Sequence, residues 1–305
     1  MSAMDEAELS AKARRLAAVI EPFAGQVYFS PECHGEYAGL GFSPSPRQVN
    51  GVALPDGPAY FCSRGSVLGQ VPGELVASAF AVFSPSAVVP AVTFGWSITD
   101  AATIERARTE GAIAQLTRIL GPAPEGVERV RDVLDRASGS QRVAGKPLYA
   151  GVLAHEVPSS PLGAAWRYAD RLREYRGDAH TAAWTSAGFD AVEIGLLTEL
   201  YWGLPLKTYI RSRGWSEAEL DDGIRRLEYR GLLRDGSFTE LGREVREAVE
   251  LNTDGQCRPV VESLGDDFDE VISLLRPIGK AIRAQRGYPP SGPHDLAGLS
   301  PRRGI

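Results

Sequence analysis

Residues 216–247 read SEAELDDGIRRLEYRGLLRDGSFTELGREVRE, and this stretch decides the fold of the C-terminal third of the chain. Ser216 and Glu219 form a capping box, in which each side chain bonds the backbone N–H of the other at a helix start. The helix that they open carries apolar residues on one face, at Leu220, Ile224 and Leu227. The turn at Asp235-Gly236 then predicts a short β-hairpin, followed by a further helix.

Two shorter helices precede this stretch. Asp190 and Glu193 form another capping pair, and the helix that they open ends before Gly203. A short helix follows and ends at Gly214, since glycine is common just after a helix end. The order helix, helix, capped helix, wing and helix is that of a winged helix-turn-helix. We therefore expect a winged-helix module over about residues 190–252.

The module resembles MarR-type regulators in the helix end LEYRGLL and in the helix restart TELGRE. The whole chain resembles an actinobacterial family of proteins of roughly 300 residues that carry only a helix-turn-helix label. The stretches YFSPE (28–32), YFCSR (60–64) and YRGDAH (175–180) carry this second resemblance. The first resemblance implies a winged-helix fold. The second implies an architecture and candidate residues without a reaction.

The rest of the chain predicts a mainly all-α fold, with β-structure confined to the small wing. Apolar residues at helical spacing predict a helix from residue 8 that closes at Pro22, and Asp100 caps another that runs to about Leu120. Further helices are expected over residues 148–157 and 161–175. The predicted divisions are a helical body (1–188), the winged-helix domain (189–262), a C-terminal helix (263–285) and a loose tail (286–305).

Composition restricts the class of protein. Hydrophobic residues make up 43% of the 305 residues and charged residues 24%, which are values typical of folded globular chains. The net charge of -6 argues against a broad basic surface for nucleic acid. Three scattered cysteines indicate a reducing compartment, and we find neither a signal peptide nor a membrane-spanning apolar run. We therefore expect a cytoplasmic protein with no membrane partner.

The front half of the would-be recognition helix is acidic. It carries four carboxylates, at Glu217, Glu219, Asp221 and Asp222. Such a cluster suits the helix dipole but opposes contact with phosphates. The basic candidates for DNA contact lie later, at Arg225, Arg226, Arg230 and Arg234. DNA is therefore the less favoured partner of this module.

A second group of candidates lies at Arg176-Gly177-Asp178-Ala179-His180, between two expected helices. In a functional interpretation, Arg176 binds a carboxylate or phosphate, and His180 serves as a hydrogen-bonding or acid–base group. In a structural interpretation, Asp178 caps the following helix and His180 is simply half-buried. The sequence leaves both interpretations open.

An aromatic-rich segment runs from residue 28 to residue 96. It predicts either ordinary core or an apolar pocket with polar handles at Tyr28, Tyr60 and Arg64. In the pocket interpretation, His180 and Trp184 close the pocket from the other side. We find no histidine or cysteine spacing typical of a metal site and no phosphate-binding glycine loop. No metal is expected, and the cofactor is left unassigned.

Two functions follow from these observations. The favoured one is a small-molecule-binding protein, which could be an enzyme of specialised metabolism, with a structural winged helix. The alternative is a ligand-responsive, MarR-like transcriptional regulator that binds DNA as a homodimer. Neither the ligand nor a reaction can be named from the sequence.

Overall fold

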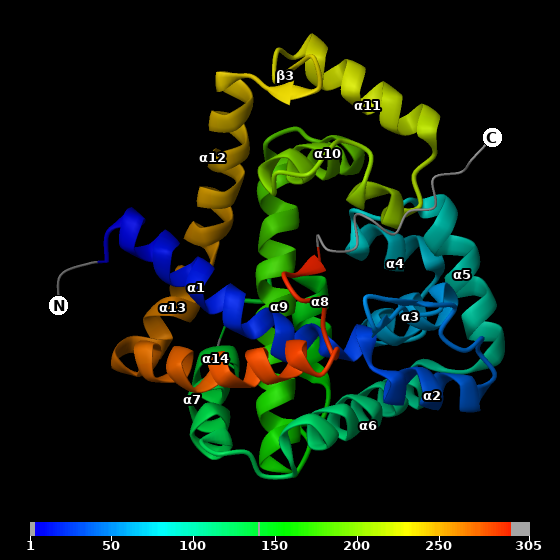
Figure 1. Cartoon of the computed structure of the whole chain (residues 1–305), viewed down its shortest axis with the longest axis vertical. Helices are drawn as coiled ribbons and strands as arrows, with labels where there is room; N and C mark the ends of the chain where they lie inside the picture. Colours follow the sequence, from blue (N-terminus) through cyan, green and yellow to red (C-terminus); the bar gives the residue numbers. More distant parts are fainter. Residues whose placement is uncertain (1–3, 140, 294–305) are drawn as a thin grey trace.

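Helix α9 (Pro161–Ser186) runs through the middle of the molecule (Figure 1). Five helices pack against it, namely α1 (Glu6–Gly25), α6 (Ala101–Leu120), α7 (Val127–Gly139), α8 (Pro147–Ala154) and α12 (Glu240–Gln256). The computed structural model describes residues 4–139 and 141–293. The remaining elements before α9 are η1 (Gln26–Phe29), α2 (Pro31–Leu40), β1 (Gln48–Val49), β2 (Val52–Ala53), α3 (Gly57–Gly65), η2 (Ser66–Leu68), α4 (Gly73–Phe80) and α5 (Pro85–Ile98).

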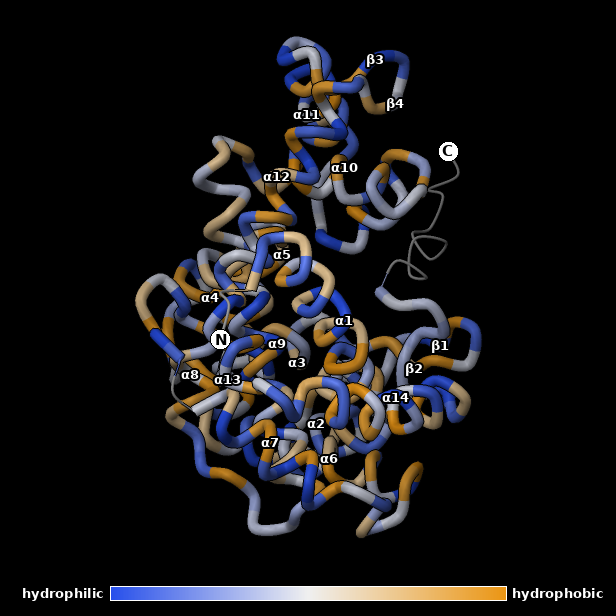
Figure 2. The backbone as a smooth tube through the Cα atoms, turned by 90° about the vertical axis from the view of Figure 1, so that its left-hand side faces the viewer, coloured by the Kyte–Doolittle hydropathy of each residue, from blue (hydrophilic) through white to orange (hydrophobic). Residues whose placement is uncertain are grey.

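The winged-helix elements follow α9 in the predicted order and lie at one end of the molecule (Figures 1 and 2). They are α10 (Ala191–Tyr201), η3 (Tyr209–Arg213), α11 (Glu217–Tyr229), β3 (Leu233–Arg234), β4 (Ser237–Phe238) and α12 (Glu240–Gln256). The chain then returns to the body through α13 (Arg258–Leu264), η4 (Gly265–Asp267) and α14 (Phe268–Ala284). The prediction of a mainly all-α fold is confirmed.

The local signals that predicted the module are present in the structure. Both capping boxes form, at Asp190 with Glu193 and at Ser216 with Glu219. Gly214 adopts the left-handed conformation that ends η3, at a φ of 81°. The wing pairs Leu233 with Phe238 and Arg234 with Ser237 in antiparallel register. Each of these caps and turns is formed between residues that are close in the sequence.

Three predicted helix ends are wrong. The helix expected over residues 148–157 ends earlier, at Ala154, whereas α1 and α9 end later than expected. Helix α1 does not close at Pro22 but continues to Gly25, because Phe23 and Ala24 are completely buried and packing outweighs the bond that proline cannot make. Helix α9 does not break at Arg176-Gly177. Glycine costs a helix interior only about 1 kcal/mol, and the nearby residues Tyr175, Asp178 and Ala179 are buried.

A second small hairpin, β1 with β2, was not predicted. It pairs Gln48 with Ala53 and Val49 with Val52 through the turn at Asn50-Gly51, where both central residues have positive φ. A two-residue turn of this kind has a backbone twist that matches the twist of the two strands it joins.

The buried apolar residues form separate clusters in the body and the module. The body cluster joins α1, α2, α6, α7 and α9 to α13 and α14. The module has its own cluster, which includes Trp184, Phe189, Leu197, Leu220 and Leu227. The end of α9 supplies Trp184, so the same helix takes part in both clusters.

The first part of the predicted loose tail is packed. Tyr288 is 1% exposed, and its hydroxyl donates to Glu21 Oε1 at 2.8 Å. Residues 294–305 of that predicted tail lie outside the described residues.

Helices α2 and α6 approach closely at Gly111, where an added Cβ would lie 2.6 Å from Cys33 Cα. We expect Gly111→Ala to lower the free energy of unfolding by about 1–3 kcal/mol, because backbone atoms would have to move. The matched control is Gly35→Ala on α2, where an added Cβ meets nothing within 4 Å. It should raise stability by up to about 1 kcal/mol. Urea unfolding measures both changes, and equal effects would contradict this description of the contact.

Candidate functional site

A cleft of about 610 Å³ lies between the helical body and the winged-helix module. The second half of α9 forms one wall, with contributions from α1, α3, η3 and α12. A second cavity of about 440 Å³ adjoins it on the side of η3 and α3. The residues that line both cavities are Glu21, Tyr60, Phe83, Arg173, Arg213 and Pro293.

The structure brings most of the sequence-predicted site residues to this cleft. The larger cavity is lined by five of them, namely Tyr60, Arg64, Arg176, Asp178 and His180. Tyr28 lines the smaller cavity, and its ring lies 5.3 Å from that of Tyr60. Trp184 lines neither cavity. It is 4% exposed and packs in the core of the module, so the prediction that it closes the pocket is wrong.

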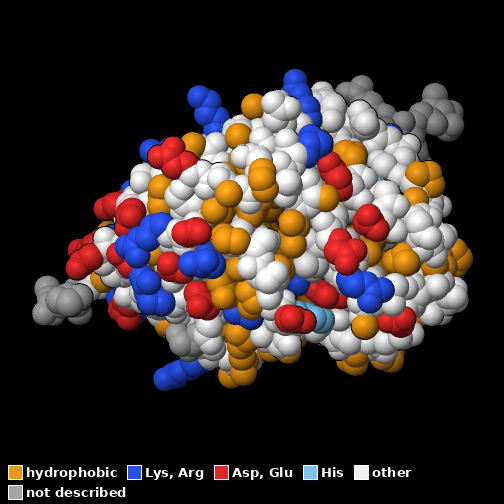
Figure 3. Space-filling view, turned by 90° about the horizontal axis from the view of Figure 1, so that it is seen from below, with side chains coloured by type: hydrophobic (Ala, Val, Ile, Leu, Met, Phe, Trp, Pro, Cys, Tyr) orange, Lys and Arg blue, Asp and Glu red, His pale blue; other side chains and the backbone are white. Residues whose placement is uncertain are grey.

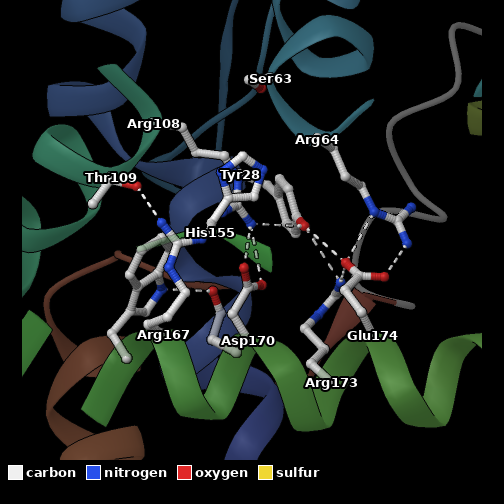
Figure 4. A network of polar contacts seen from close by, with 12 residues as sticks. Tyr28, Ser63, Arg64, Arg108, Thr109, His155, Arg167, Asp170, Arg173 and Glu174 are labelled. Carbon is white, nitrogen blue, oxygen red and sulfur yellow. Dashed lines mark hydrogen bonds and ion pairs between the residues drawn. The ribbon is translucent and has the colours of Figure 1, made fainter. Parts of the chain in front are cut away.

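Arg64 is held by a buried carboxylate rather than free to meet a ligand. Its guanidinium bonds Glu174 at 2.8 and 3.1 Å, and Arg173 bonds the same carboxylate at 2.9 Å (Figure 4). Burial by itself would raise the pKa of Glu174, but the two guanidiniums lower it to about 2. The Tyr28 hydroxyl also donates to Glu174, at 3.3 Å. These four side chains therefore fix α3 and η1 against α9.

The same face of α9 continues this network deeper into the body. Asp170 pairs with Arg108 at 2.9 Å, and Arg167 donates to Thr109 at 2.7 Å (Figure 4). Arg108, Asp170 and Arg167 are all at most 1% exposed. They do not line either cavity, so their ion pairs serve the packing of α6 against α9.

A separate ion-pair cluster joins α12 to α9 and α1. Asp254 is completely buried and accepts from Arg14 at 2.7 Å and from Arg176 at 2.8 Å. His180 Nδ1 lies 3.1 Å from Thr253 Oγ1 and 3.9 Å from Glu250. Burial lowers the pKa of His180 to about 4, so the imidazole is neutral at pH 7.

The structural interpretation predicted that Asp178 caps the helix that follows it, and this is wrong, because Asp178 lies inside α9. Its carboxyl accepts instead from the backbone N–H of Tyr149 at 2.9 Å, in the first turn of α8. Burial raises the pKa of this carboxyl to about 7. Asp178 is therefore a cap supplied from a different helix, and it is close to its titration point at neutral pH.

Two other arginines of the cleft have no carboxylate partner among the described residues. The Arg213 guanidinium stacks over Phe83 at 4.4 Å and over Tyr209 at 4.7 Å, and it donates to the Tyr209 hydroxyl. Arg283 lies 5.8 Å from the centre of the Tyr288 ring, and its buried Nε has no hydrogen-bond partner. No sequence pattern singled out either residue, because the elements that face them across the cleft are distant along the chain.

The exposed face of α11 is paired rather than purely acidic. Lys207 bonds Glu217 at 3.3 Å and also contacts Asp221, and Arg211 contacts Glu217. The first two arginines predicted to contact DNA are themselves paired, Arg225 with Asp222 at 2.9 Å and Arg226 with Asp190 at 2.6 Å.

The other two arginines predicted to contact DNA differ from each other. Arg230 bonds Glu193 at 3.0 Å and stacks over Phe189 at 4.3 Å, while Arg234 is exposed on the wing. Three of the four guanidiniums are thus already engaged within the module.

The surface shows no broad field of one sign on the face away from the module. Acidic and basic side chains alternate there with apolar ones (Figure 3). Within residues 4–139 and 141–293, no group of three or more His, Cys, Asp or Glu side chains is placed to hold a metal ion. In the same residues no single helix is long and apolar enough to span a membrane, although the bent pair α5 and α6 passes that test together.

The module and the body together define a helix-turn-helix protein, with a domain of the type used to bind DNA. A family model described as "Helix-turn-helix family" matches residues 13–289, and the chain belongs to this family. The match covers the body as well as the module, so both are parts of one family unit. No curated protein and no solved structure matches the chain.

The raised pKa of the Asp178 carboxyl makes the free energy of unfolding depend on pH. Because its pKa is raised from 3.8 to about 7, the native state keeps a proton that the unfolded chain loses, and stability falls as pH rises through this range. We expect Asp178→Asn to match the wild type near pH 4 and to be more stable by about 1–3 kcal/mol at pH 8. His180 titrates in both proteins and cancels in the comparison. Urea unfolding at both pH values measures the difference, and a difference independent of pH would contradict the assignment.

Proposed function

We propose that this protein binds a small molecule in the cleft between its body and its winged helix, and that the winged helix is mainly structural. The observation that carries this proposal is the cleft of about 610 Å³, which has the size of small-molecule sites. Its walls combine apolar and aromatic side chains with a few polar groups, as such sites do. An enzyme of specialised metabolism is one form that this function could take.

The contacts of the module support the structural part of the proposal. Helix α12 packs against α9 and α1, and Asp254 ties it there through two arginines. Arg225, Arg226 and Arg230, which would have to contact DNA, are engaged with acidic residues of the module itself. Breaking such pairs to reach a phosphate would offset part of the gain from the new contact.

Filling the cleft tests the proposal. We expect Thr181→Trp to weaken binding of the neutral fluorescent probe phenyl-naphthylamine at least about tenfold, because Thr181 lines the larger cavity. The matched control is Thr185→Trp, one turn later on α9, exposed and outside both cavities. It should bind the probe as the wild type does. Equal binding by all three proteins would place the probe elsewhere and contradict a ligand cleft here.

The alternative, a MarR-like regulator that senses a ligand and binds DNA as a dimer, is favoured by two observations. The helix-turn-helix domain is of a type that binds DNA, and Arg234 is exposed on its wing. In this alternative, a ligand between body and module would change the position of α11. A cytoplasmic location and a homodimeric state remain predictions under either function.

Fluorescence anisotropy with duplex DNA from the region upstream of the protein's own gene distinguishes the two functions. We expect weak binding at low salt that neither selects sequence nor changes with Arg234→Ala. Site-selective binding with a steep salt dependence, reduced by Arg234→Ala, would support the regulator instead.

A further inference from the structure

We propose that the ligand of the cleft is an organic anion with an aromatic skeleton, whose acidic group is bound by Arg213 and Arg283. This inference rests on the proposed function and names the class of ligand. Both arginines line the larger cavity, and neither has a carboxylate partner among the described residues.

The charges around the cavity leave these two arginines in excess. Six arginines and four carboxylates line it. Each carboxylate is already engaged, Glu21 by Arg173, Glu174 by Arg64 and Arg173, Asp178 by the Tyr149 N–H, and Glu250 by Arg176 and Arg246. A bound anion would neutralise part of the remaining positive charge, whereas a bound cation would add to it.

Arg213 is held ready for such a group. Its guanidinium is stacked on Phe83 and Tyr209, so its plane is fixed before a ligand arrives. A fixed guanidinium loses little conformational freedom when it bonds a carboxylate, sulfonate or phosphate through two parallel N–H groups. Its place in the lining of both cavities puts it where the two adjoin.

Arg283 supplies an independent observation. Its Nε is buried and has no hydrogen-bond partner in the described structure. A buried donor without a partner is costly, and an acidic oxygen in the cleft could accept from this guanidinium. Among the described residues, no ion pair joins the Arg283 guanidinium to a carboxylate.

The aromatic side chains that line the larger cavity indicate that the ligand has an aromatic skeleton. Tyr60, Phe80 and Phe83 form a connected group of rings with centroid separations of 5.7 to 6.3 Å. All three line the larger cavity, and Trp202 lines it from the module. Aromatic rings gain from edge-to-face and offset contacts with such walls, beyond the burial of apolar area.

Two fluorescent probes with the same ring system test this class of ligand. Anilinonaphthalene sulfonate carries an anionic group, and phenyl-naphthylamine is its neutral counterpart. We expect Arg213→Met and Arg283→Met each to weaken sulfonate binding about tenfold or more, with binding of the neutral probe changed less than about twofold. The matched control is Arg276→Met, which lies on α14 with Arg283 but is exposed and outside both cavities. It should change neither affinity.

The outcomes separate the ligand class from the proposed function. If the neutral probe binds in the cleft and either folded arginine variant keeps the sulfonate affinity of the wild type, the anion proposal is overturned and the cleft stands. If Thr181→Trp weakens the binding of neither probe, the proposed function itself fails. A thermal unfolding midpoint for each variant identifies any that does not fold, and either arginine variant alone is sufficient to decide.

Discussion

Helix α9 is continuous, and this continuity joins the helical body to the winged helix. The middle of α9 carries the buried carboxylates that bind α3, α6 and η1, and its end supplies Trp184 to the core of the module. A break at Gly177 would separate the body from the winged helix. Because the helix does not break, Arg173, Arg176, Asp178 and His180 lie within two turns of one another on the wall of a single cleft.

The arginines of this region fall into two kinds, and the distinction determines what the cleft can do. Arg64, Arg173 and Arg176 are engaged by buried carboxylates, and removing one partner of such a pair would leave a charge without compensation. These residues hold helices together. Arg213 and Arg283 are stacked on aromatic rings instead, without a carboxylate, and their charge stays available to a ligand. Sequence alone does not distinguish the two kinds.

The winged helix could be predicted from sequence because its signals are local. Capping boxes, the Gly214 helix end and the Asp235-Gly236 turn each depend on residues a few positions apart. The site depends on contacts between distant segments, such as Arg64 with Glu174 and Arg213 with Phe83. Residues of the aromatic and YRGDAH segments line the cleft, whereas Trp184 does not, because it is buried in the core of the module.

A crystal structure of the protein bound to anilinonaphthalene sulfonate would show whether the cleft binds an organic anion. We expect the probe in the cleft beside α9, with sulfonate oxygens within hydrogen-bonding distance of the guanidiniums of both Arg213 and Arg283. A probe bound only on the outer surface, with the cleft empty, would contradict it.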